Sequence, residues 1–257
     1  MLELKNIGVE FMSGTPDANL LFSDFNLTVE DGEFVSIVGS NGSGKTTLLN
    51  LVGGSLVPGK GNVVFNGKDI TFVSEYKRAG KFGRVFQDPH AGTCSGLTIL
   101  ENMALADNKG RMFGLGRAIG KKNLDRYRAL LEQCGMGLEN RLGTLVGTLS
   151  GGQRQALALV IANMTDIDLL ILDEHTAALD PKSSETIMEL TKKLICEKNI
   201  TTLMVTHNLR YAVDYGTRLI MMHEGKCVID VSGEEKRKML VDDILQKFNE
   251  ISIECGN

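Results

Sequence analysis

The chain has 257 residues, enough to bury a large core, and its formal net charge of −4 argues against a nucleic-acid-binding protein that works through overall charge. Its five cysteines are scattered, odd in number and without a C-x-x-C pair, so we expect reduced cysteines with neither a disulfide framework nor a zinc site. Charges interrupt the N-terminus where a signal peptide needs apolar residues, and no window approaches the roughly 18 apolar residues of a membrane span, so we expect no transmembrane segment.

A glycine-rich stretch, GSNGSGKTT, gives the first chemical signal along the chain. Gly39, Gly44, Lys45 and Thr46 fit the pattern G-x-x-x-x-G-K-[ST], in which a bent backbone turns successive amide hydrogens toward one anion. We therefore predict a phosphate-binding loop that consists of Gly39, Ser40, Asn41, Gly42, Ser43, Gly44, Lys45, Thr46 and Thr47.

The flanking sequence supplies the structure that such a loop needs. The apolar run EFVSIV predicts a buried strand before the loop, and TTLLNLV predicts a helix after it that stops at Gly53. A helix start directs unpaired amide hydrogens at the phosphates, while Lys45 can reach the terminal phosphates and the Thr46 hydroxyl can bind magnesium. The alternative is a glycine turn with a solvated lysine, which the full match in this context disfavours.

Two kinds of sequence alternate along the rest of the chain. Aliphatic and β-branched runs before about residue 87 and after about residue 163 indicate an α/β core; they include FNLTV, NVVF, DLLILD, TTLMVTH and TRLIMMHEG. Residues 88–162 instead carry the helical patterns TILENMALA, LDRYRALLEQCG and QRQALALVIANM, which predict a helical lobe inserted into the core. A further helix is predicted over residues 234–248.

A basic run lies within this lobe at residues 109–128, with seven cations against one acid. Its glycine-rich part, GLGRAIG, is not expected to bind nucleotide because no strand precedes it. The run suits contact with a membrane subunit or an anionic lipid surface, and a solvated loop and helix face is the equally open alternative.

A second helix start with small residues follows in LSGGQ. Ser150 is a good N-cap, and Gly151 and Gly152 let an anion approach the start of the helix that continues from Gln153. The chain thus has two helix starts suited to phosphate, whereas one nucleotide has only one terminal phosphate. This mismatch raises the question of whether the two helix starts meet across two subunits.

The apolar strand LLIL ends abruptly in Asp173 and Glu174. In a parallel sheet such a pair lies at the carboxyl edge, where these folds bind ligands. Asp173 would then belong to the magnesium shell, and Glu174 would orient or deprotonate the attacking water. An acidic pair after a strand is often only a helix cap, but the upstream phosphate loop favours the catalytic interpretation.

Together, GSNGSGKT, LSGGQ and LLILDE resemble the nucleotide-binding subunits of ATP-binding cassette (ABC) transporters over nearly the whole chain. The resemblance implies one ABC ATPase domain over residues 1–257, with a P-loop NTPase core at 1–87 and 163–257 and a helical subdomain at 88–162. The core would contain a mixed, mainly parallel sheet and an N-terminal antiparallel β region. The resemblance also implies a head-to-tail homodimer formed on ATP binding, with each ATP between the phosphate loop of one protomer and LSGGQ of the other.

Four further residues match positions to which the family gives a role. The resemblance implies that Phe11 stacks on adenine, with a core phenylalanine as the alternative. Gln87 matches the glutamine that contacts magnesium and the attacking water, Asp180 matches the loop that crosses the dimer interface, and His207 matches the histidine that contacts the terminal phosphate. The other histidines, His90, His175 and His223, are expected to be structural. His175 departs from the family, which more commonly has proline after the two acids; the departure leaves both acids in place and bears on how the loop is held.

The resemblance further implies an ATPase that uses ATP and Mg²⁺ and powers transport from the cytoplasmic face of the cell membrane, with a separate transmembrane permease as its partner. The stretches VGSNGSGKTTLLN and DEHTAALDPKSS resemble the ATP-binding subunits of bacterial tryptophan or tyrosine uptake systems. This predicts an amino-acid importer with an extracytoplasmic solute-binding protein and no nucleic-acid partner. The alternative is a soluble cassette ATPase of the iron–sulfur assembly type that does not serve transport.

Overall fold

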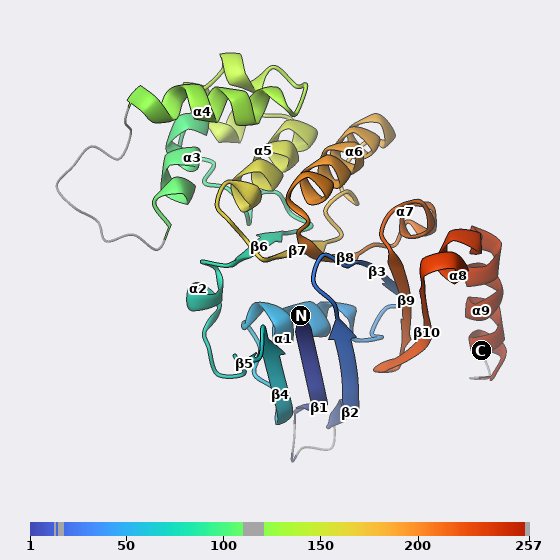
Figure 1. Ribbon diagram of the computed structural model, residues 1–257. Helices are drawn as coiled ribbons and strands as arrows, with labels where there is room; N and C mark the ends of the chain where they lie inside the picture. Colours follow the sequence, from blue (N-terminus) through green and yellow to red (C-terminus); the bar gives the residue numbers. More distant parts are fainter. Residues whose placement is uncertain (13, 15–17, 110–120, 255–257) are drawn as a thin grey trace. The chain divides into compact units, whose positions relative to one another are not determined.

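The computed structural model describes residues 1–12, 14, 18–109 and 121–254 (Figure 1). The chain divides into two compact units: unit 1, from Met1–Val73 and Thr201–Asn257, and unit 2, Ser74–Ile200. Both units combine helices with strands, so the fold class is α/β, as the sequence predicts. Among the described residues, no helix is long and apolar enough to cross a membrane.

The first sheet of unit 1 is antiparallel, as predicted for the N-terminal region, and has the strand order β2-β1-β4-β5. Its strands are β1 (Leu2–Phe11), β2 (Asn19–Val29), β4 (Lys60–Phe65) and β5 (Lys68–Asp69). Burial alternates along the last part of β2, where Phe25, Leu27 and Val29 are buried. This alternation is typical of a sheet with one face against the core.

The second group of strands in unit 1 is mixed and mainly parallel. Its strands are β3 (Phe34–Gly39), β8 (Thr201–Val205), β9 (Arg218–His223) and β10 (Lys226–Ser232). β3 pairs in parallel with β8 and with β9, and β10 pairs antiparallel with β9. All six residues of β3 are buried, which accounts for its continuous apolar run. The loops after β3, β8 and β9 therefore leave the same carboxyl edge, where α1 (Lys45–Gly53) and α7 (Leu209–Asp214) begin.

The C-terminal segment differs from the prediction of one helix over residues 234–248. It forms two helices, α8 (Gly233–Lys238) and α9 (Val241–Glu254). Met239 has an extended backbone between them, and the Asp243 carboxylate accepts a hydrogen bond of 2.7 Å from the Leu240 amide, which begins a new helix. Helix α9 is held on unit 1 by a buried apolar cluster of Val38, Ala212, Leu219, Met221, Ile244 and Ile251.

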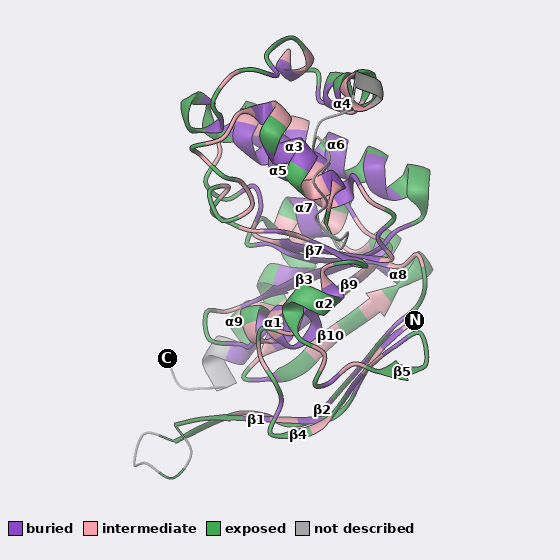
Figure 2. Ribbon diagram, turned by 90° about the vertical axis from the view of Figure 1, so that its left-hand side faces the viewer, coloured by how far each residue is buried: buried purple, intermediate pink, exposed green. Residues whose placement is uncertain are grey.

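Unit 2 is built mainly from helices. Its described residues include the strands β6 (Phe82–Val85) and β7 (Leu169–Asp173), which pair in parallel. Its helices are α2 (Glu75–Arg78), α3 (Ile99–Asp107), α4 (Lys121–Glu132), α5 (Gly151–Asn163) and α6 (Pro181–Lys198), with 3-10 turns at Leu138–Asn140 and Val146–Thr148. α3, α4 and α5 coincide with the three predicted helical patterns, and most of α5 is buried (Figure 2). Of the predicted basic run, residues 110–120 lie outside the described residues.

Candidate functional site

The predicted phosphate loop lies in unit 1 between the carboxyl end of β3 and the start of α1. Its path depends on glycine at two positions. A Cβ on Gly39 would lie 2.2 Å from the Met222 carbonyl oxygen, and a Cβ on Gly44, where φ is +101°, would lie 2.8 Å from the Phe22 ring. A larger residue at Gly39 would displace backbone, and one at Gly44 would have a strained φ and would have to move the buried Phe22 ring.

The loop holds a cation against its own backbone. Lys45 is buried, and its Nζ donates hydrogen bonds of 2.8 Å each to the carbonyl oxygens of Gly39 and Ser40. The N-cap of α1 is Gly44, which makes no side-chain cap, and the first turn of the helix carries no acid. The start of α1 therefore combines amide hydrogens, the positive end of a helix dipole and an ammonium group, a combination that binds phosphate.

His207 belongs to the same edge of unit 1 as the phosphate loop. β8 pairs with β3 so that Val205 lies opposite Ile37, and the Thr206 amide donates a hydrogen bond of 3.2 Å to the Ile37 carbonyl oxygen. Both strands end within two residues of this pair. The exposed His207 therefore follows β8 at the edge where the loop leaves β3.

A second histidine, which the sequence analysis placed among the structural ones, also reaches the loop. His223 Nδ1 lies 3.4 Å from Ser40 Oγ. The contact arises because β9 pairs in parallel with β3 and places Met222 opposite Gly39. Strand order is a property of the fold, so nothing in the local pattern TRLIMMHEG could have predicted it.

Phe11 ends β1 and pairs with Asn19 of β2. Its side chain is 40% exposed, so it is not a core residue. An exposed aromatic ring at a strand end is available for stacking on a flat ligand. Its role in binding adenine stays a prediction.

In unit 2, Asp173 is the last residue of β7 and Glu174 follows it, as the sequence predicts. Both residues are half-buried, and Glu174 has a φ of +48°, a left-handed conformation that few residues other than glycine adopt. Gln87 follows β6, whose Val85 lies opposite Leu172 in the parallel pair. Gln87 and the two acids therefore leave the same edge of these strands.

The helix that follows the two acids has its own N-cap. The Asp180 side chain accepts a hydrogen bond of 3.0 Å from the Ser183 amide at the start of α6. Hydrogen bonding by Ser183 lowers the pKa of the Asp180 carboxyl below its ordinary value. The cap of α6 is therefore supplied by Asp180, and the roles of Asp173 and Glu174 stay predictions.

His175 anchors the loop between these acids and α6. It is buried, and its Nε2 lies 3.3 Å from the Thr191 hydroxyl oxygen of α6. Burial lowers the pKa of His175 to about 4, so the imidazole is neutral near pH 7. A side-chain contact with α6 thus holds the loop where the family more commonly has proline.

Ser150 and Gln153 form a complete capping box at the start of α5. Ser150 Oγ accepts a hydrogen bond from the Gln153 amide, and Gln153 Oε1 accepts one from the Ser150 amide, both at 3.3 Å. A Cβ on Gly152 would lie 2.9 Å from Ser183 Oγ, so packing against α6 favours glycine there. Ser150 and Gly151 are exposed, so this helix start combines internal capping with surface access.

The candidate metal ligands are all oxygen donors, namely the Thr46 hydroxyl in unit 1 and the Asp173 carboxylate and Gln87 amide in unit 2. Within the part of the chain that the structure describes, no group of three or more His, Cys, Asp and Glu side chains could hold a metal ion. Oxygen atoms are the ligands that Mg²⁺ prefers in proteins. That the three donors bind one magnesium ion stays a prediction.

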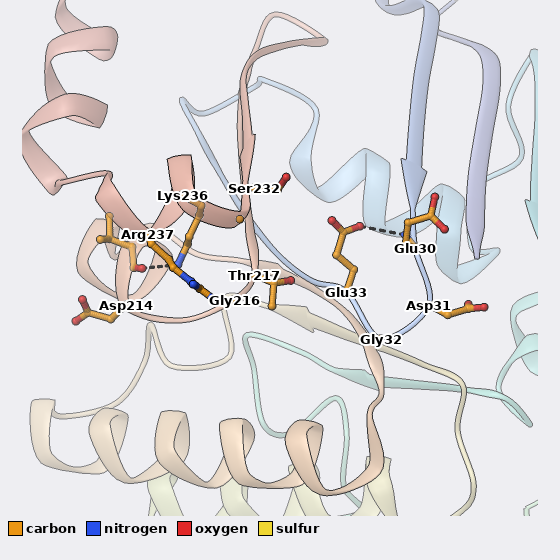
Figure 3. Close-up of a pocket in the computed structure, with 12 residues that line it drawn as sticks. Glu30, Asp31, Gly32, Glu33, Asp214, Gly216, Thr217, Ser232, Lys236 and Arg237 are labelled. Carbon is orange, nitrogen blue, oxygen red and sulfur yellow. Dashed lines mark hydrogen bonds between the residues drawn. The ribbon is translucent and has the colours of Figure 1, made fainter.

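A separate pocket of about 620 Å³ lies at the other end of the strands of unit 1 (Figure 3). Glu33, Thr217 and Lys236 are among the residues that line it. It lies at the amino ends of β3 and β9, one strand length of roughly 20 Å from the carboxyl edge that carries the phosphate loop. Two of its charged groups are already paired within the protein, Glu33 with Arg218 at 3.3 Å and Lys236 Nζ with the Tyr215 carbonyl oxygen at 2.9 Å. We therefore do not assign this pocket to the nucleotide.

Comparison with known proteins gives matches over most of the chain. The sequence model described as ABC transporter matches residues 22–177. The chain is 47% identical over 248 residues to the tyrosine transport ATP-binding protein of Clostridioides difficile (strain R20291), covering 96% of this chain and 98% of that protein. It is 34% identical over 239 residues to the phosphonates import ATP-binding protein PhnC 1 of Ruegeria sp. (strain TM1040), covering 90% and 88% of the two chains.

Solved structures of ATP-binding cassettes are similar to this chain as well. A dimeric cassette in a post-hydrolysis state, bound to ADP and Pi, matches with a TM-score of 0.77 and 32% identity over 90% of this chain and 98% of that one. A nucleotide-free cassette from an ABC transporter matches with a TM-score of 0.80 and 25% identity over 100% and 99% of the two chains.

Proposed function

The chain belongs to the ABC transporter family, as an ATP-binding subunit that hydrolyses ATP, and from this premise we propose that it powers a bacterial importer of amino acids or a similar small solute. Such subunits dimerise and work with membrane permease partners. The observation that carries the proposed substrate is the 47% identity to a tyrosine transport ATP-binding protein over 96% of this chain. The proposal includes a peripheral position on the cytoplasmic face of the membrane and an extracytoplasmic solute-binding protein.

The phosphate loop is the proposed site for the ATP phosphates. The phosphate oxygens accept hydrogen bonds from the backbone amides at the start of α1. They also attract the Lys45 ammonium away from the carbonyl oxygens of Gly39 and Ser40. Phe11 stacks on the adenine. Magnesium, held by Thr46, Asp173 and Gln87, would neutralise charge on the phosphates when bound.

Hydrolysis in this proposal needs an oriented water and a stabilised terminal phosphate. Glu174 orients or deprotonates the water, because a half-buried carboxylate is a hydrogen-bond acceptor that is partly protected from solvent. Gln87 leaves the same strand edge and positions the same water. His207 donates a hydrogen bond to the terminal phosphate.

Dimer closure brings the start of α5 of the partner protomer to the bound ATP. The LSGGQ segment of the partner, with Ser150, Gly151, Gly152 and Gln153, meets the terminal phosphate, and Asp180 lies at the interface. The Ser150 hydroxyl suits this role because it accepts the Gln153 amide hydrogen and still has its own hydrogen to donate to phosphate. Closure moves the attached permease, and hydrolysis reverses it.

Affinity purification of the tagged chain from detergent-solubilised native membranes tests this proposal, with mass spectrometry of the proteins that accompany it. Recovery of a polytopic permease supports the transport role, and recovery of a solute-binding lipoprotein supports import and supplies a protein for amino-acid binding assays. Recovery only from the soluble fraction with soluble partners would overturn the transport role and favour the iron–sulfur assembly alternative.

A further inference from the structure

A guanidinium group lies against the carboxylate that ends β7 in unit 2. Arg84 Nη2 is 3.4 Å from Asp173 Oδ2, and the two side chains are only 14% and 15% exposed. The contact follows from the parallel pairing of β6 with β7, which places Arg84 opposite Ile171. The two charges therefore interact where little water screens them.

Two other groups fix the position of this guanidinium. Its Cζ lies 4.7 Å from the centre of the Phe86 ring, within the range of a cation–π interaction. Its Nη1 lies 3.8 Å from Glu75 Oε1 of α2. A planar guanidinium can stack on a ring and contact carboxylates at its edge at the same time, which a lysine ammonium does less well. Arg84 is thus held beside Asp173 and is not a solvated surface cation.

The position of Arg84 bears on what Asp173 can bind. A carboxylate that pairs with a guanidinium must exchange that partner, or share it, when a divalent cation approaches, and the positive charge of Arg84 repels the cation. We propose that Arg84 competes with a divalent cation for Asp173 and so sets how tightly this carboxylate takes up the cation together with the nucleotide. This inference rests on the proposed role of Asp173 as a magnesium ligand.

The same strand pair contains a matched control. Lys81 Nζ lies 3.4 Å from Asp168 Oδ1, the same separation as in the Arg84 pair, but the two side chains are 61% and 38% exposed. The Lys81 pair lies at the amino ends of β6 and β7, away from the edge that carries Asp173. Loss of Lys81 removes one cation from the same strands without touching the proposed metal ligand.

The test measures the dissociation constant of a non-hydrolysable ATP analogue by calorimetry, once with excess Mg²⁺ and once with EDTA. The dissociation constant in EDTA divided by that in Mg²⁺ reports how strongly the metal favours nucleotide binding, without any contribution from hydrolysis. Arg84→Gln should raise this ratio about tenfold, the factor that corresponds to about 1.4 kcal/mol. Arg84→Lys, which keeps the charge, should stay within about twofold of the wild type, and Lys81→Gln should not change the ratio.

An unchanged ratio in Arg84→Gln would overturn the inference, as would an equal rise in Lys81→Gln. Circular dichroism confirms that each variant folds, and Arg84→Met replaces Arg84→Gln if the latter does not. Asp173→Asn separates this inference from the proposed function. If Mg²⁺ strengthens nucleotide binding equally in the wild type and in Asp173→Asn, Asp173 is not a metal ligand and both proposals about it fail.

Discussion

Ser150 offers a substitution that separates folding from dimer closure. In Ser150→Asp the new carboxylate can still accept the hydrogen bond from the Gln153 amide, so we expect the free energy of unfolding to stay within about 0.5 kcal/mol of the wild-type value. Ser150→Ala loses the cap and should lower the free energy of unfolding by about 1 kcal/mol. Urea denaturation of the two variants and the wild type measures both effects.

The aspartate also places a negative charge where the proposal puts the terminal phosphate of the partner's ATP. Two like charges about 4 Å apart repel by about 4 kcal/mol at an effective dielectric constant of about 20, and because the symmetric dimer contains two such contacts the total of about 8 kcal/mol corresponds to about a millionfold weaker association. Light scattering with ATP present measures the dimer, in a Glu174→Gln background so that hydrolysis does not disperse it. Ser150→Ala, which adds no charge, should weaken dimerisation much less. If Ser150→Asp dimerised as readily as its parent, Ser150 would not meet the phosphate.

The other predictions concern the catalytic base, the loop lysine and a buried thiol. Glu174→Gln should bind ATP, hydrolyse almost none and accumulate dimers, as measured by ATPase assay and light scattering; near-normal turnover would exclude Glu174 as the base. Lys45→Ala should weaken ATP binding itself by at least about tenfold in calorimetry, because the loop loses the ammonium group that is proposed to bind the phosphates, and unchanged affinity would contradict that role. Burial raises the pKa of the Cys134 thiol to about 12. At about pH 8 iodoacetamide should therefore alkylate Cys134 far more slowly than the exposed Cys196, as measured by mass spectrometry. Equal alkylation rates would show that Cys134 is accessible.

The parts of the site that could be predicted from the sequence are those whose chemistry is local. The spacing of Gly39 and Gly44 predicts the phosphate loop because both glycines have a positive φ in the turn between the strand and the helix, a local backbone requirement, whereas their close contacts with β9 and β2 come from the fold. Ser150 is predicted as an N-cap because its hydrogen-bond partner, Gln153, lies only three residues further along the chain, in the pattern S-x-x-Q. The apolar run before Asp173 predicts a buried strand that ends in a carboxylate.

The parts that could not be predicted depend on which strands become neighbours. Arg84 meets Asp173 only because β6 lies beside β7, and His223 meets Ser40 only because β9 lies beside β3. Hydrophobic periodicity assigns each strand but not its neighbours. The break between α8 and α9 has a different, local cause: no glycine or proline marks it, and the Asp243 carboxylate accepts a hydrogen bond from the Leu240 amide three residues before it.

The two helix starts differ in a way that bears on the order of ATP binding and dimer closure. The N-cap of α1 is Gly44, which has no side chain to accept an amide hydrogen, so the first amide hydrogens of this helix and the Lys45 ammonium gain most from a phosphate. The start of α5 is already satisfied by the capping box of Ser150 and Gln153, so it needs no ligand to be stable. ATP should therefore bind first to the loop of a single protomer, and the LSGGQ helix start should add affinity only when a partner presents it to a phosphate that is already bound. It follows that Ser150→Asp should leave ATP binding by the monomer within about twofold of the wild type while it prevents closure, whereas a comparable loss of monomer affinity in Ser150→Asp and Lys45→Ala would contradict this order.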